Sequence, residues 1–119
     1  MPLTAAALAI FVAAEHLGFL VLEMFLWDKP AGLALFRQSP EKAAASRALA
    51  ANQGLYNGFL AAGLLFSLLR GDRAGLAFFF ACVAVAGVFG AATVNRRILI
   101  LQALPAVLGL TALTLFGEK

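Results

Sequence analysis

The stretch AANQGLYNGFLAAGLLFSLL (residues 50–69) decides the fold class, because it is apolar enough to enter lipid and yet carries clustered amides. As a helix it would be about 30 Å long, which matches the hydrocarbon core of a bilayer. Within it, NQGLYNGF (residues 52–59) places four polar side chains on about two helical turns. The stretch therefore predicts a membrane span with one side facing protein, since amides that face lipid would lack hydrogen-bond partners.

The composition of the whole chain supports a membrane protein. Of its 119 residues, 63% are hydrophobic and only 13% are charged, whereas soluble domains are typically about 45–50% apolar and about 25% charged. A soluble domain of this size could not bury so much apolar surface. We predict an all-α, integral membrane, four-helix up-down bundle that forms a single domain over residues 1–119. Its predicted spans are 3–27, 50–69, 74–94 and 98–116.

The first of these runs could also be read as a signal peptide, with cleavage after Ala14. It lacks the basic residues that begin such peptides, and its apolar pattern continues to Trp27. We therefore expect a retained first span, with Trp27 as an aromatic anchor at the membrane interface.

The basic residues predict how the chain is oriented. Four spans place three of them on the side of the termini, at Arg70, Arg73 and Lys119. Six lie on the opposite side, at Lys29, Arg37, Lys42, Arg47, Arg96 and Arg97. The positive-inside rule then places both termini outside the inner membrane and loops 28–49 and 95–97 in the cytoplasm. Because the positive charge lies at helix ends, we expect no nucleic-acid partner.

The first loop contains a helix start. After a break at Pro30 and a short amphipathic piece at residues 33–36, Ser39 precedes Pro40, which is a favourable pair for an N-cap and first helical position. The second long helix is therefore expected to run from Pro40 to residue 69, with a cytoplasmic start that extends beyond the hydrocarbon.

The polar residues of this helix predict a buried face. They fall within an arc of about 140° and comprise Asn52, Gln53, Tyr56 and Asn57. Gly54 and Gly58 form a GxxxG pair on an adjoining face, which allows the close approach of another helix and offers a contact for a homo-oligomer. The polar residues suit either hydrogen bonding between helices or ligand binding.

The first span carries EHLGFLVLE (residues 15–23), with Glu15, His16 and Glu23 on an arc of about 100°. An ionisable group at the centre of a span costs roughly 2.5–3.5 kcal/mol and marks a candidate functional site. Glu15 and His16 are our candidate catalytic acid and base, since shielded carboxyls and imidazoles perform this chemistry. Glu23 is a candidate ligand-binding group, or else the ion-pair partner of Arg96 or Arg97.

Antiparallel spans bring several polar groups to one depth, near the cytoplasmic face. The candidate ligand-binding residues are Glu23, Asn52, Gln53, Tyr56, Asn57, Arg96 and Gln102. We expect no metal site, because one span supplies both of these carboxylates and the only histidine, and the single Cys82 offers no thiolate cluster. The sequence does not identify a cofactor.

The motifs EHLGFLVLEMFLW, ANQGLYNGFLAAGL and NRRILILQALPA resemble the domain-of-unknown-function 1304 family of small bacterial membrane proteins. The resemblance covers nearly the whole chain. It implies a four-helix integral membrane protein with signature Glu-His and Asn-Gln positions, and it implies no particular activity, substrate or cofactor.

Three functions fit these observations. The first is binding of a lipophilic small molecule in a polar pocket within the bundle, with Glu15 and His16 able to move a proton. The second is an accessory or structural subunit, in which the polar residues hold helices or partners together. The third is transport of a proton or small ion, for which four short helices would need an oligomer.

Overall fold

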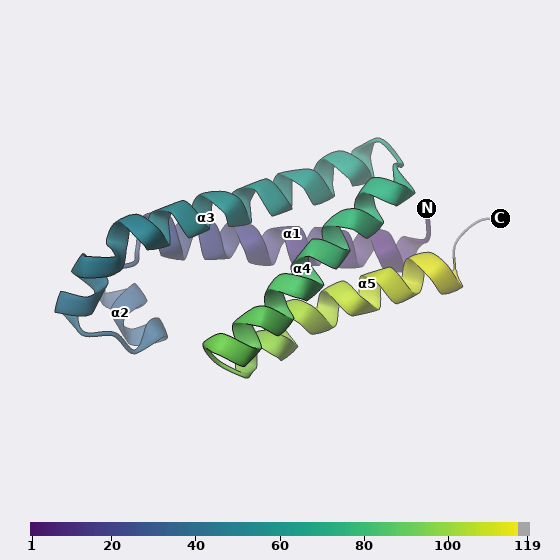
Figure 1. The fold of residues 1–119 in the computed structure, drawn as a ribbon. Coiled ribbons are helices and arrows are strands. Elements are labelled where there is room, and N and C mark those ends of the chain that lie inside the picture. The colour runs from purple at the N-terminus through teal and green to yellow at the C-terminus, as the bar shows by residue number, and fades with distance from the viewer. Residues whose placement is uncertain (117–119) are drawn as a thin grey trace. The chain divides into compact units, whose positions relative to one another are not determined.

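A computed structural model describes residues 1–116, and within this range the chain contains five α-helices and no strand (Figure 1). The all-α prediction is therefore confirmed. In chain order the elements are α1 (Leu3–Met24), α2 (Pro30–Phe36), α3 (Pro40–Leu69), α4 (Arg73–Thr93), the π-helix η1 (Leu99–Ala103) and α5 (Leu104–Leu115).

The long helix α3 begins and ends where the sequence predicts. Ser39 lies just before its first residue, Pro40, and the Ser39 hydroxyl accepts a hydrogen bond from the backbone N–H of Lys42 at 3.2 Å. This bond satisfies one of the N–H groups that the first turn of a helix leaves unpaired. The predicted N-cap and the start of this helix at Pro40 are confirmed, whereas the position of this start outside the hydrocarbon stays a prediction.

The first helix ends earlier than predicted, at Met24 instead of Trp27. The chain then turns so that Gly32 of α2 lies directly against the backbone of this turn. A Cβ atom at Gly32 would stand 1.9 Å from the carbonyl oxygen of Leu26 and 2.7 Å from that of Trp27. The turn depends on this backbone contact, which hydrophobicity along the sequence does not reveal.

The last predicted span contains a short π-helix, η1, followed by the α-helix α5. Pro105 has no N–H for the carbonyl four residues earlier, and the π-helix η1 ends two residues before it. In η1 the backbone N–H of Leu104 bonds to the carbonyl of Leu99, a step of five residues. At Gly87, α4 approaches this segment so closely that a Cβ atom would lie 2.6 Å from the backbone nitrogen of Ala103.

The chain divides into two compact units. Unit 1 comprises Met1–Ala13 and the chain from Leu60 onward, and in it α4 lies beside η1 and α5 (Figure 1). Its hydrophobic core consists of Ala5, Ala9, Val12, Ala13, Ala61, Leu64, Leu76, Phe80, Val83, Ala106, Ala112 and Leu113.

Unit 2 comprises Ala14–Phe59, and it therefore holds the second part of α1, all of α2 and the first part of α3. The indole N–H of Trp27 donates to the Ser46 hydroxyl at 3.0 Å, and its ring lies 4.7 Å from that of Phe36. An ion pair joins Asp28 to Arg47 at 3.5 Å. These contacts connect the turn after α1 to both α2 and α3.

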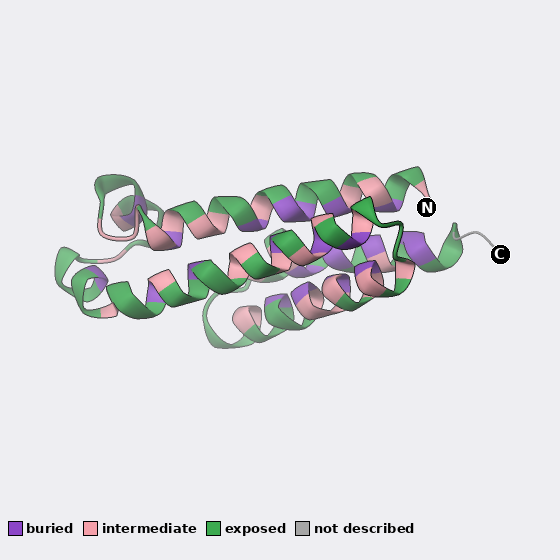
Figure 2. Ribbon diagram, turned by 90° about the horizontal axis from the view of Figure 1, so that it is seen from above, coloured by how far each residue is buried: buried purple, intermediate pink, exposed green. Residues whose placement is uncertain are grey.

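Exposed residues occur along every helix (Figure 2), and many of them carry large apolar side chains. Two helices, Leu3–Met24 and Arg73–Thr93, are long and apolar enough to cross a membrane, and Leu99–Leu115 is a shorter apolar helix. Only 28% and 22% of the spanning windows of the two long helices are buried within the chain.

Candidate functional site

The polar centre of unit 2 is the carboxylate of Glu23, which is only 6% exposed. The side-chain amide of Gln53 donates to its Oε2 atom at 2.8 Å, and the amide of Asn57 donates to its Oε1 atom at 2.5 Å. Gln53 and Asn57 lie four residues apart and so share a face of α3. Each carboxylate oxygen therefore receives one amide donor from the facing helix. We call these three residues the Glu23 clamp.

Each amide of the clamp is followed in the chain by a glycine, Gly54 or Gly58. A Cβ atom at Gly54 would lie 2.8 Å from the Cγ atom of Met24 and 3.2 Å from the carbonyl oxygen of Leu20. At Gly58 it would lie 2.6 Å from the Cδ1 atom of Leu20. The GxxxG pair thus packs α3 against α1 of the same chain. A homo-oligomer through the same glycines stays a prediction, and it would have to form beside this contact.

His16 is fully buried. Its ring makes an edge contact with Phe19, one turn further along α1, with 5.1 Å between the ring centres. A buried imidazole can donate and accept hydrogen bonds, and it can exchange a proton with a neighbouring group.

Glu15 differs from Glu23 and His16, the other two polar residues of this stripe of α1, in its hydrogen bonding. Its side chain is partly buried, and its Oε1 atom is inaccessible to solvent and has no hydrogen-bond partner among the described residues. An unsatisfied buried polar atom of this kind costs about 1–3 kcal/mol, and more when it is charged. Such an atom in a native structure points to a missing partner, such as a water molecule or a ligand.

The predicted polar arc of α3 divides into two pairs. Gln53 and Asn57 form the clamp, and Asn52 and Tyr56 are also four residues apart. Asn52, Gln53 and Tyr56 are exposed and Asn57 is partly buried, so the prediction that this arc is a buried face is wrong for three of its four residues. The Tyr56 ring lies against that of Phe59, at 5.6 Å between centres. The same helix therefore presents one amide pair to α1 and one amide–phenol pair outward from the chain.

The other two candidate residues belong to unit 1. Arg96 is exposed and follows Asn95, whose side-chain oxygen accepts a bond from the backbone N–H of Arg97 at 2.9 Å. Gln102 lies in η1 and is partly buried. Their participation in a site with Glu23 stays a prediction.

Sequence reasoning missed the link between Trp27 and Ser46, which extends the polar contacts of α1 and α3 by one more pair. Ser46 in turn donates to the carbonyl oxygen of Lys42 at 2.8 Å. Trp27 ends the first predicted span and Ser46 lies shortly before the second, which was a signal for this pair, but the pairing itself depends on the turn after α1. Among the described residues, no group of three or more His, Cys, Asp or Glu side chains could hold a metal ion.

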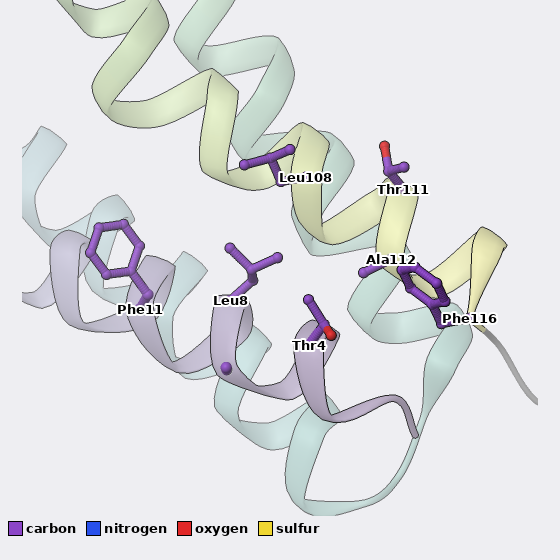
Figure 3. A pocket seen from close by; sticks show the side chains of 8 residues that line it. Thr4, Leu8, Phe11, Leu108, Thr111, Ala112 and Phe116 are labelled. Atoms are coloured by element: carbon purple, nitrogen blue, oxygen red, sulfur yellow. The ribbon is translucent and has the colours of Figure 1, made fainter.

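A cavity of about 550 Å³ lies in unit 1 (Figure 3). It is lined by Thr4, Ala7, Leu8, Phe11, Leu108, Thr111, Ala112 and Phe116. The only polar side chains in this lining are the two threonines, and the Thr111 hydroxyl already donates to the carbonyl oxygen of Val107. The cavity therefore suits hydrocarbon, and it lies outside the set of residues that the sequence nominates for a polar pocket.

Residues 10–114 match a protein family described as "Protein of unknown function (DUF1304)". Because this match covers most of the chain, the chain belongs to that family. No curated protein and no solved structure shows a significant match.

Proposed function

We propose that this DUF1304 family member is an integral membrane protein that binds the polar head of a lipophilic small molecule beside the stripe formed by Glu15, His16 and Glu23. In this proposal the chain crosses the membrane four times, with both termini outside and loops 28–49 and 95–97 in the cytoplasm.

The exposed apolar surface supports the membrane location. A core helix in a soluble protein is mostly buried, whereas only 28% and 22% of the spanning windows of α1 and α4 are buried. Large side chains such as Ile10, Phe11, Phe78 and Phe89 are more than half exposed. Soluble monomers rarely leave so much contiguous apolar surface in water. In a bilayer, lipid would cover these apolar side chains, and the free-energy cost of exposing them to water would be avoided.

The observation that carries the ligand proposal is the unpaired Oε1 atom of Glu15. A hydroxyl or N–H group on a bound molecule would supply the donor that the described residues do not supply. Fully buried His16 is the next residue in the chain. A ligand held beside Glu15 and His16 would thus meet a carboxyl and an imidazole, the pair needed to take up and release a proton.

The clamp residues have a different part in this proposal. Gln53 and Asn57 hold Glu23, so one end of the site has a fixed hydrogen-bonding pattern before the ligand arrives. Preorganisation of this kind lowers the entropic cost of binding. Asn52, Tyr56, Arg96 and Gln102 are the further ligand-binding groups that we propose.

A second function is favoured by a specific observation. Both Glu23 oxygens have partners within the chain, as expected if the polar residues serve only to hold helices together. In that case the protein is an accessory or structural membrane subunit. The two proposals differ in what they require of Glu15, because an unpaired carboxylate oxygen does nothing to hold helices together.

Native mass spectrometry of the protein, extracted in a mild detergent, tests the ligand proposal. We expect a small molecule to co-purify with the wild-type protein and to be lost from the Glu15→Gln and Asn57→Ala variants. Glu41→Gln is the matched control, since Glu41 is exposed in the first turn of α3. Identical, ligand-free spectra for all four proteins would refute ligand binding and favour the structural role.

A further inference from the structure

The helix α2 is unusual for an exposed segment because it contains no polar side chain. Its sequence is PAGLALF, and Gly32 is its only buried residue. Leu35 is 60% exposed and Phe36 is 37% exposed. The exposed apolar side chains of this helix would be costly in water, at about 25 cal/mol for each Å² of apolar surface.

The position of α2 within unit 2 is fixed by contacts on its inner side. Gly32 lies against the carbonyl oxygens of Leu26 and Trp27, and the Phe36 ring packs on Trp27. Arg37 ends the helix in a left-handed conformation, with its N–H bonded to the carbonyl oxygen of Leu33. The exposed flank is therefore a defined surface and not the side of a loose loop.

Positive charge stands at both ends of this apolar flank. Lys29 precedes the first residue of α2, Arg37 follows the last, and both are exposed. Lys42 and Arg47 add two more cations on the start of α3, against only Asp28 and Glu41 as acidic residues in the same segment. Arg47 pairs with Asp28, which leaves Lys29 and Arg37 as the two cations that bracket the apolar residues.

We infer that α2 and its two bracketing cations, Lys29 and Arg37, form a docking surface for anionic phospholipid, with the apolar residues at the acyl boundary and the cations on the phosphates. An apolar face with basic residues at its margin is the arrangement by which helices lie in a membrane interface. Each Lys or Arg near an anionic leaflet contributes about 1 kcal/mol, or roughly a five-fold enrichment of anionic lipid. A stable protein interface takes about 20–30 residues a side, far more than α2 offers.

This inference rests on the membrane location proposed above, but not on the ligand near Glu15. Trp27 is the only tryptophan of the chain and packs on α2, so its fluorescence reports on lipid at this surface. The full-length protein is placed in nanodiscs of phosphatidylcholine and phosphatidylglycerol at fixed proportions. Two samples are compared, one with brominated acyl chains on phosphatidylcholine and one with brominated acyl chains on phosphatidylglycerol. Bromine quenches tryptophan fluorescence on contact.

We expect brominated phosphatidylglycerol to quench Trp27 about three- to five-fold more strongly than brominated phosphatidylcholine at equal mole fraction, in line with the enrichment per cation. In the Lys29→Gln/Arg37→Gln variant this preference should vanish while quenching by both lipids persists. Arg70→Gln/Arg97→Gln removes the same charge from two exposed residues outside the surface and should keep the preference.

Equal quenching by the two lipids in the wild-type protein would overturn the inference, as would a preference that survives in the Lys29→Gln/Arg37→Gln variant. Absence of quenching by either lipid would also overturn it and would indicate that protein covers α2. The wild-type comparison needs no variant, so it stands even if a variant fails to fold. Ligand retention in native mass spectrometry is a separate readout, so the two proposals can fail independently.

Discussion

Glu23 and Glu15 lie on the same helix, about 12 Å apart along its axis, and they have opposite local environments. Glu23 is more deeply buried, yet amides of α3 bond both of its oxygens. Glu15 is less buried, yet one of its oxygens is enclosed and has no hydrogen-bond partner within residues 1–116. The comparison teaches that burial alone does not mark a functional carboxylate. A buried carboxylate oxygen that lacks a hydrogen-bond partner is a better indication of a functional carboxylate than the degree of burial.

The largest expected effect is on Glu23. Glu23→Ala would leave the amides of Gln53 and Asn57 without their acceptors, at a cost of about 3–6 kcal/mol in the free energy of unfolding, because hydrogen bonds to a charged group contribute about 1.5–3 kcal/mol each. Denaturant titration in detergent micelles, followed by circular dichroism, measures this change. Glu41→Ala, on the exposed first turn of α3, is the control and should change it by less than about 0.5 kcal/mol. If the two variants were equally stable, the clamp would not contribute to the fold.

The next effect concerns the close approach of α3 to α1 at the clamp. Gly54→Ala would place a methyl group 2.8 Å from Met24 and 3.1 Å from the Cβ atom of Glu23. We expect this to destabilise the protein by about 1–3 kcal/mol, as overpacking does.

Gly18→Ala is the matched control for Gly54→Ala, because nothing lies within 4 Å of the added methyl group at Gly18. There the substitution should stabilise the helix by about 0.5–1 kcal/mol, since alanine loses less backbone entropy than glycine. Thermal unfolding of both variants under one detergent condition should give changes of opposite sign. Changes of the same sign would show that α3 does not pack closely on α1 at Gly54.

Glu15 should respond with the sign opposite to that of Glu23. Glu15→Leu removes an unsatisfied polar atom, and we expect a gain of about 1 kcal/mol in the free energy of unfolding of the ligand-free protein, within the range of such penalties. Glu23→Leu should destabilise it, for the reason given for alanine. The two variants are compared by denaturant titration after delipidation. A loss of stability in both would mean that Glu15 has a structural partner, and the contrast between the two carboxylates would then be false.

The smallest effect is expected at the end of α1, where Trp27 bonds to Ser46. Ser46→Ala should cost about 0.5–1.5 kcal/mol, the usual contribution of one neutral hydrogen bond. A double-mutant cycle with Trp27→Phe, followed by circular dichroism, isolates the contribution of the bond itself. Additive losses would show that the bond contributes nothing to stability, and that the Glu23 clamp is the principal polar link in unit 2.

Local sequence was sufficient to predict much of the helical framework. Ser39 and Pro40 predicted the start of α3 correctly, because an N-cap acts on N–H groups only two or three residues away. The early end of α1 at Met24 escaped prediction, because it depends on the contact of Gly32 with a carbonyl group six residues earlier in the chain. The π-helical step of η1 also escaped prediction, although Pro105 has no N–H for the carbonyl four residues earlier.

For the candidate site, periodicity placed Asn52, Gln53, Tyr56 and Asn57 on one arc of α3 but could not say which of them meet α1. Asn52 and Gln53 are neighbours of the same chemical type, and only Gln53 bonds to Glu23. The wheel angle between adjacent residues is about 100°, so the rotation of α3 about its own axis decides between them, and only packing against α1 sets that rotation. Likewise, the sequence marks Glu15 and Glu23 equally as ionisable residues in an apolar helix, and it does not reveal which one receives donors.

The sequence by itself determined that the chain is all-helical and where α3 starts, because hydrophobic runs and helix caps act over a few neighbouring residues. It also determined the family, because family motifs are read directly from the order of the residues. Only the tertiary structure decided that Glu23 is paired and that Glu15 retains an unpaired oxygen. The reason is that a hydrogen bond between helices depends on a fit of a few tenths of an ångström, and residues some thirty positions apart in the chain set that fit.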